Sequence, residues 1–314
     1  PNPQPHSFLF LFLSSIFFFF LLFPPMENSL PTVFLWSHPR SVSTAFYRGF
    51  EAAGKDGWGT TMPEKVLVDR VAALEKGEKI VFGDVIQEAT QKGPLLFNEH
   101  IGHCLVQDFV NLKRDEDFLK RGKHVFIFRD PEKAIPSLAK MWYLSNEKSN
   151  QGAKMPKAFE AWGLAGATPL QKLRILRGYE AMERFILDFE DFFGFRPVVI
   201  DADILLQYPE KTLDYVCNQL SLPFQGKDMM TWDGEIQNVD PSLTMWFETA
   251  NTTKGFKSKK PATKEEIRAK GEEYLAVVTE EWREAAHKCI EECQEVYSRL
   301  KKMSVTKDCL GIKE

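Results

Sequence analysis

Short apolar runs alternate with longer amphipathic segments along most of the chain. Five of these runs have the pattern of strands buried in a sheet, and they lie at 32–36, 79–82, 95–97, 124–128 and 197–201. Segments with helical spacing lie at 45–54, 131–142 and 210–220, and the stretch 263–303 predicts one closing helix, or two that break at Gly271. Strands that alternate with helices predict an α/β fold with a parallel sheet flanked by helices on both faces.

Residues 1–25 differ from the rest, because they are mostly Phe, Leu, Ser and Pro and carry no charge. The apolar run 8–23 has the length of a signal-peptide core, but no Lys or Arg precedes it and no small-residue cleavage site follows. It is also shorter than the roughly 20 residues that span a bilayer. These four residue types share pyrimidine-rich codons. We therefore expect a translated upstream region or a disordered segment, with Met26 as the start of a single domain, 26–314, that ends in helices.

Charge and cysteine usage narrow the class of protein. The chain has 40 Lys and Arg against 44 Asp and Glu, a formal net charge of −4, which argues against a nucleic-acid-binding surface. None of the five cysteines forms the C-x-x-C spacing of a zinc site or a redox dithiol. We expect free thiols, a cytoplasmic location and, if Met26 is the start, no membrane association.

The polar loop 37–44, SHPRSVST, lies between a predicted buried strand and a predicted helix. Unpaired N–H groups and the dipole at a helix N-terminus attract anions, and Arg40 adds a planar cation suited to phosphate or sulfate. The loop has no Gly and no Lys, so it lacks the G-x-x-x-x-G-K-[ST] pattern of magnesium-dependent triphosphate hydrolysis. The alternative is that the loop only caps the helix.

A second polar group follows the strand 124–128. Arg129 stands at its carboxyl end, the edge of a parallel sheet where ligands bind, and Ser137 follows on the next predicted helix. An arginine there can bind a phosphate with two hydrogen bonds while a serine hydroxyl adds a third. The alternative is a surface ion pair of Arg129 with Asp130 or Glu132.

The pair PRSVST and RDP-x5-S resembles the two signatures of the sulfotransferase superfamily, which implies a P-loop sulfotransferase-like fold over roughly 32–256. The donor implied is 3′-phosphoadenosine 5′-phosphosulfate (PAPS), and the chemistry requires no metal. By this resemblance the first loop holds the 5′-phosphosulfate, and its residues are Arg40, Ser41, Val42, Ser43 and Thr44. Arg129 and Ser137 would hold the 3′-phosphate. The segments 230–232 and 252–256 resemble a late family stretch in which Lys254 and Gly255 would contact the same phosphate.

Two positions of the first loop differ from common members of that superfamily. Val42 occupies a place where glycine is common, and a β-branched residue restricts the backbone. Arg40 stands where many cytosolic members have Lys, and we expect it to stabilise the leaving phosphate oxygen. For the base that takes the acceptor proton, the candidates are His100, His103 and Glu64.

The sequence thus predicts an enzyme that transfers a sulfuryl group from PAPS to a small hydroxyl or amine acceptor. Two alternatives stay open: a P-loop nucleotide kinase or triphosphatase, and a non-catalytic nucleotide-binding module. The acceptor does not follow from the sequence, because acceptor pockets are built from variable loops such as 144–170.

Overall fold

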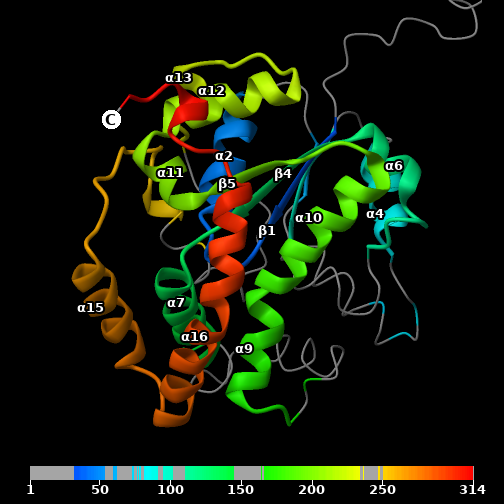
Figure 1. The fold of residues 1–314 in the computed structure, drawn as a ribbon. Helices are drawn as coiled ribbons and strands as arrows, with labels where there is room; N and C mark the ends of the chain where they lie inside the picture. Colours follow the sequence, from blue (N-terminus) through cyan, green and yellow to red (C-terminus); the bar gives the residue numbers. More distant parts are fainter. Residues whose placement is uncertain are drawn as a thin grey trace, which may run out of the picture. The chain divides into compact units, whose positions relative to one another are not determined.

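Five parallel strands form a sheet in the computed structural model, in the order β2-β3-β1-β4-β5. Figure 1 labels three of them, β1, β4 and β5. Their bounds are β1 Val33–Ser37, β2 Gly59–Thr61, β3 Leu95–His100, β4 Lys123–Phe128 and β5 Val198–Asp201. The structure describes residues 32–53, 59–61, 81–90, 95–101, 110–144, 166–233 and 250–313, with a few isolated positions between them. Residues 1–31 lie outside this set, so the domain start at Met26 stays a prediction.

The strand order creates a switch point beside β1. The chain leaves β1 for β2 and β3 on one side, and β4 and β5 then extend the sheet on the other side. In open parallel sheets the crevice at the carboxyl ends of the strands beside such a point is where ligands bind. The loops after β1 and β4 both open into this crevice.

Alternation along β1 explains why both faces of the sheet are covered. Phe34 and Trp36 belong to one apolar cluster, and Val33 and Leu35 belong to the other. The second cluster is completed by α2 (Ser43–Ala53), α11 (Ala202–Gln207), α12 (Pro209–Leu220) and α13 (Lys227–Met230). The first is completed by α4 (Phe82–Thr90), α6 (Glu116–Arg121), α7 (Pro131–Tyr143), α9 (Pro169–Arg177), α10 (Tyr179–Phe193), α15 (Lys264–Leu275) and α16 (Glu280–Met303). The predicted fold class is therefore confirmed.

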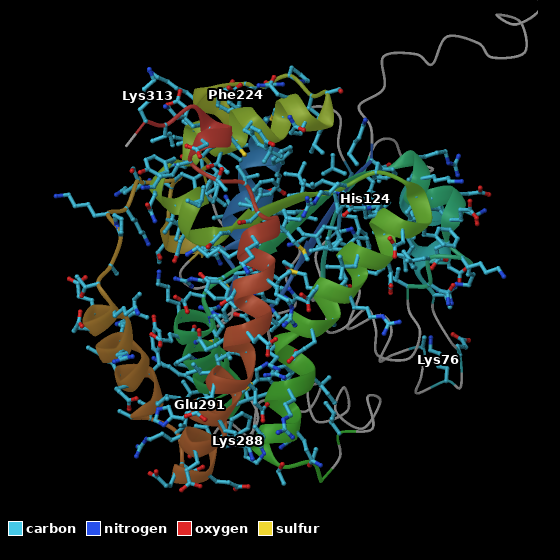
Figure 2. All side chains as sticks on the ribbon, viewed as in Figure 1. Lys76, His124, Phe224, Lys288, Glu291 and Lys313 are labelled. Carbon is cyan, nitrogen blue, oxygen red and sulfur yellow. The ribbon has the colours of Figure 1, made fainter. Side chains whose placement is uncertain are left out.

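A buried histidine joins the first cluster at the amino end of β4. His124, labelled in Figure 2, is 2% exposed and accepts a hydrogen bond at Nδ1 from Trp36 Nε1 at 3.0 Å. Its Nε2 therefore carries the ring proton and donates to the Leu119 carbonyl at 2.7 Å. Burial lowers the pKa of His124 to about 3, so the ring is neutral.

Most predicted elements agree with the structure, with three corrections. The run 79–82 is not a strand where it is described, because Phe82 begins α4; the edge strand is β2, whose short Gly59–Thr61 segment has no apolar run to reveal it. Gly271 does not break the closing helix, because it lies buried inside α15. The helices α9 and α10 were not predicted. Gly54, the last residue of the predicted helix 45–54, and most of the loop 144–170 lie outside the described residues.

Helix α7 begins as its sequence predicts, and α15 packs closely on it. The Asp130 carboxylate accepts from the Glu132 backbone N–H at 2.9 Å, and Pro131 occupies the first turn. Gly271 faces Pro136 inside α7. Among the helices of the described ranges, none combines the length and the apolar character needed to cross a bilayer.

Two helical glycines should respond oppositely to alanine. A Cβ at Gly49 would lie 2.6 Å from the Met229 carbonyl oxygen, so Gly49→Ala should lower the free energy of unfolding by about 1–3 kcal/mol. A Cβ at Gly271 would meet Pro136 Cγ at 3.4 Å, an ordinary contact, so Gly271→Ala should raise it by up to about 1 kcal/mol. Urea denaturation of both variants checks the pair, and equal effects would contradict the close approach of α2 to α13.

Candidate functional site

The loop after β1 turns sharply at two residues that are not glycine. Arg40 has φ 69° and Val42 has φ 71°, both in the left-handed region. The Val42 carbonyl then accepts from the Ala45 and Phe46 N–H groups at 3.1 and 3.2 Å, which starts α2. A β-branched residue at positive φ is strained, and strain of this kind gathers at functional sites. A positive φ at this position is also a physical reason why glycine is common there in the superfamily that the motifs resemble.

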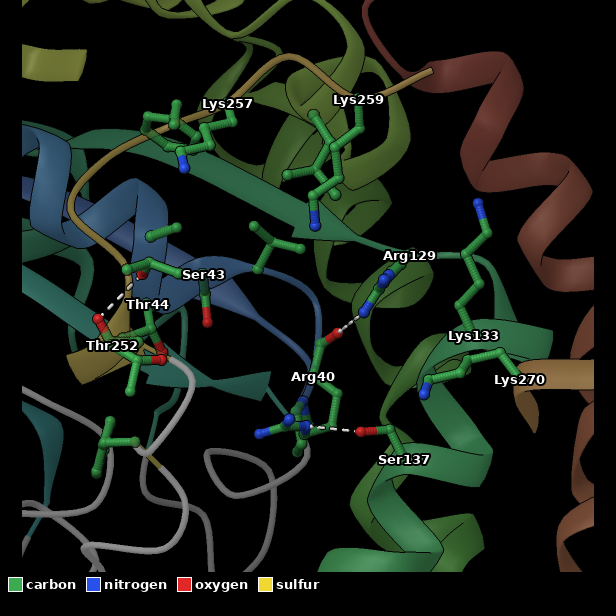
Figure 3. A pocket seen from close by; sticks show the side chains of 18 of the residues that line it. Arg40, Ser43, Thr44, Arg129, Lys133, Ser137, Thr252, Lys257, Lys259 and Lys270 are labelled. Carbon is green, nitrogen blue, oxygen red and sulfur yellow. Dashed lines mark hydrogen bonds between the residues drawn. The ribbon is translucent and has the colours of Figure 1, made fainter. Parts of the chain in front are cut away.

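The two polar segments singled out in the sequence contact each other. Arg129 Nη1 donates to the Arg40 carbonyl at 3.1 Å, and Arg40 Nε donates to Ser137 Oγ at 3.0 Å (Figure 3). The Ser137 hydroxyl accepts in this contact, so its own proton stays available to a ligand. Arg129 forms no ion pair with a carboxylate of the described ranges, in contrast to the alternative of a surface pair with Asp130 or Glu132.

A cavity of about 870 Å³ lies where these segments meet. It is lined by most of the residues that the sequence singled out: Arg40, Val42, Ser43, Thr44, His100, Arg129, Ser137, Lys254 and Gly255. Ser41 does not line the cavity; its side chain is fully buried and its Oγ has no hydrogen-bond partner. The candidates His103 and Glu64 lie outside the described residues.

Lysines that sequence reasoning missed add positive charge to this cavity. They are Lys133 on α7, Lys257 and Lys259 in the segment before α15, and Lys270 on α15 (Figure 3). Lys133 pairs with Asp203 at 2.5 Å and Lys270 pairs with Glu273 at 2.7 Å. Over the described lining, seven Lys and Arg side chains stand against two Glu side chains. The run KSKK at 257–260 was the sequence signal that could have revealed two of them.

Lys254 reaches the cavity because its segment pairs with residues near α13. Gly255 forms an antiparallel bridge with Thr231, flanked by Phe256 N–H to the Met230 carbonyl at 2.9 Å. Gly255 has φ 146°, and a Cβ there would lie 2.3 Å from the Met230 oxygen. The pairing therefore requires glycine. The two late segments, 230–232 and 252–256, therefore lie side by side in the fold.

His100 ends β3 at the edge of the cavity, and its ring is oriented by β1. Ser37 Oγ lies 2.9 Å from His100 Nδ1 and donates to the Glu99 carbonyl at 3.4 Å. Because Ser37 lies on β1, this contact fixes the orientation of the imidazole ring at the edge of the cavity. An imidazole in such a position is a common general base. His100 is 9% exposed, which limits its access to water.

Two further residues near Arg129 escaped the sequence analysis. His38 and Tyr179 are buried and form hydrogen bonds to the Arg129 backbone. His38 could have been noticed, since it lies in the polar loop 37–44, directly before the motif PRSVST. Tyr179 begins α10, which was not predicted, and nothing in the sequence pointed to it.

The arrangement fits a bound oxyanion. Arg129 Nε is buried without a hydrogen-bond partner, and leaving such a donor unpaired costs about 1–3 kcal/mol. A phosphate oxygen satisfies a guanidinium donor of this kind. Within the part of the chain that the structure describes, no three His, Cys, Asp or Glu side chains are grouped to hold a metal ion.

The strain at Val42 is measurable as a stability difference. Val42→Gly and Val42→Ala both remove the side-chain packing, but only glycine relieves the positive φ. We expect the free energy of unfolding of the glycine variant to exceed that of the alanine variant by about 0.5–1 kcal/mol. As a control, Ala52→Gly within α2 should destabilise. An alanine variant as stable as the glycine variant would contradict the strained loop.

Comparison with known proteins gives relatives of two kinds, and no family model matches the chain. Two Arabidopsis thaliana proteins match it: branched-chain-amino-acid aminotransferase-like protein 2, 27% identical over 244 residues, and protein 1, 26% identical over 238 residues. These matches cover 73% and 72% of the chain, which spans only 37% and 36% of the length of these curated relatives.

Two sulfotransferases are among the solved structures that match most of the chain. The mouse sulfotransferase SULT7A1, complexed with PAP, matches 87% of this chain and 87% of its own, with a TM-score of 0.46 and 12% identity. The sulfotransferase domain from the curacin biosynthetic pathway matches 79% of this chain and 99% of its own, with a TM-score of 0.35 and 12% identity.

Proposed function

We propose that the chain binds PAPS and transfers its sulfuryl group to a small hydroxyl or amine acceptor. The observation that carries this proposal is the convergence of two motifs 89 positions apart, joined by the contact from Arg129 to the Arg40 carbonyl at one cavity wall. Cations at two places on that wall suit a ligand with anionic groups at both ends.

The first loop and the Arg129 segment take different parts of the donor in this proposal. Arg40, Ser43, Thr44 and the first N–H groups of α2 hold the 5′-phosphosulfate. Arg129, Ser137 and Lys254 hold the 3′-phosphate, with the orphaned Arg129 Nε among the donors. The fixed left-handed turn at Arg40 keeps these donors oriented before the ligand arrives, which lowers the cost of binding.

The transfer step needs a nucleophile, a leaving group and a proton acceptor. The acceptor oxygen or nitrogen forms a bond to sulfur while the bond from sulfur to the bridging 5′-phosphate oxygen breaks. Arg40 stabilises the charge that develops on that oxygen, and the acceptor proton passes to the His100 side chain. His100 is our choice of base because it lines the cavity and Ser37 orients its ring.

The two alternatives have distinct signatures. A nucleotide kinase or triphosphatase would show magnesium-dependent ATP turnover that Arg40→Ala abolishes. A non-catalytic module would bind PAP, the desulfated donor, without transfer to any acceptor in a broad panel. The absence of Gly and Lys from the loop 37–44 favours sulfuryl transfer over triphosphate chemistry.

Removing the Arg129 guanidinium should weaken binding of the 3′-phosphate. We expect Arg129→Ala to raise the Kd for PAP by about 10- to 100-fold in calorimetry, because hydrogen bonds to charged groups are worth about 1.5–3 kcal/mol. The affinity for AMP, which lacks the 3′-phosphate, should change far less. The matched control is Arg184→Ala, whose side chain is 80% exposed on α10. Unchanged PAP binding in Arg129→Ala would refute the site assignment.

Replacing the proposed base should slow transfer without weakening donor binding. We expect His100→Asn to lower kcat by about 10²- to 10⁴-fold with labelled PAPS and a panel of phenols, alcohols and amines. PAP affinity should stay close to that of the unmodified chain. A variant with full kcat would exclude His100 and leave the base to Glu64 or His103.

A further inference from the structure

The first residue after β1 is a histidine with both ring nitrogens engaged. His38 Nε2 accepts from the Arg129 backbone N–H at 2.8 Å, so the ring proton resides on Nδ1, which donates to the Pro39 carbonyl at 2.9 Å. The side chain is 1% exposed, and burial lowers its pKa to about 4. His38 is therefore neutral and held in one tautomer.

The Arg129 carbonyl is held from the other side. Tyr179 O–H, at the start of α10, donates to it at 2.6 Å, and the Tyr179 ring lies 4.4 Å from the His38 ring. The pairing of β4 with β1 ends at Ile127 opposite Ser37, so the sheet gives Arg129 no partner on that strand. The backbone N–H and carbonyl of Arg129 therefore bond to two buried side chains, His38 and Tyr179, instead of to a neighbouring strand.

Two separate hydrogen bonds connect the first loop to Arg129. His38 binds the Arg129 backbone, and the Arg129 guanidinium binds the Arg40 carbonyl, two residues after His38. The orientation of the guanidinium relative to the first loop is therefore fixed from both ends of the residue. Contacts within the chain therefore hold its position.

We propose that His38, supported by Tyr179, is a positioning residue that sets the affinity of the site for a 3′-phosphorylated nucleotide through Arg129. This inference rests on the proposed function. His38 and Tyr179 do not line the cavity, so neither touches the ligand. His38 is also no candidate for the base, because both its ring nitrogens are engaged in protein contacts.

The experiment compares the Kd of PAP with that of AMP in single variants. His38→Phe fills the space but leaves the Arg129 N–H buried without a partner, and we expect PAP to bind about 10- to 100-fold more weakly. AMP binding should change by no more than about twofold. His38→Gln retains an amide oxygen that can accept from Arg129, so it should restore most of the PAP affinity. Tyr179→Phe should weaken PAP binding about 5- to 10-fold.

The matched control is the second buried histidine. His124 is likewise neutral and hydrogen-bonded at both ring nitrogens, but it lies at the opposite end of β4, five residues or roughly 16 Å from Arg129. His124→Phe removes comparable contacts from the core. It should lower the Tm while leaving the ratio of the PAP and AMP affinities unchanged.

A double variant separates positioning from a general loss of stability. If His38 acts through Arg129, then adding His38→Phe to Arg129→Ala weakens PAP binding by no more than about twofold further. The inference would be overturned if the losses of PAP affinity in the two single variants added in full in the double variant. It would also be overturned if PAP and AMP binding weakened in parallel, or if PAP binding were unchanged in His38→Phe and Tyr179→Phe. If His38→Phe does not fold, the Tyr179→Phe and His38→Gln measurements decide it in the same way. An unmodified chain that does not prefer PAP over AMP would instead refute the proposed function.

Discussion

The contact between the Arg129 guanidinium and the Arg40 carbonyl is the interaction on which the site depends. It joins the loops after two adjacent strands, and the parallel register places both loops at the same edge of the sheet. Together with the hydrogen bond from the Arg129 backbone to His38, it ties the first loop to the end of β4. The strained loop, the cationic cavity wall and the buried contacts behind Arg129 all follow from bringing these strand ends together.

The fold was predictable wherever a segment carried a periodic signal, and the site wherever residues followed a buried strand. The runs VFLW of β1 and VFIF of β4 are apolar at every position, and such runs are typical of strands that are buried on both faces of a sheet. β2 has three residues and no such signal, and α9 and α10 lie in a stretch to which no helical pattern was assigned. Tyr179 was beyond reach because its role depends on where α10 packs, which is a tertiary property. Lys270 lies at the site because α15 packs on α7, which is also a tertiary property.

Local charge in this protein differs from its total charge. The chain is acidic overall, with a formal net charge of −4, yet seven Lys and Arg side chains meet at one cavity in the described residues. Elsewhere on the chain, cations are neutralised in ion pairs such as Arg299 with Glu183. Net charge is an argument only about a broad basic surface. The attraction of a small anionic ligand depends instead on the few charges that face it.

The bridge between Thr231 and Gly255 has a consequence for how the molecule assembles. It brings Lys254 to a cavity that Arg40 also lines, so the lining residues are drawn from more than two thirds of the chain. Closing so long a loop is entropically costly and offers no reward until both ends are in place. A nucleotide that recognises this cavity would bind only the completely folded chain, and by mass action its concentration would shift the folding equilibrium of the whole domain.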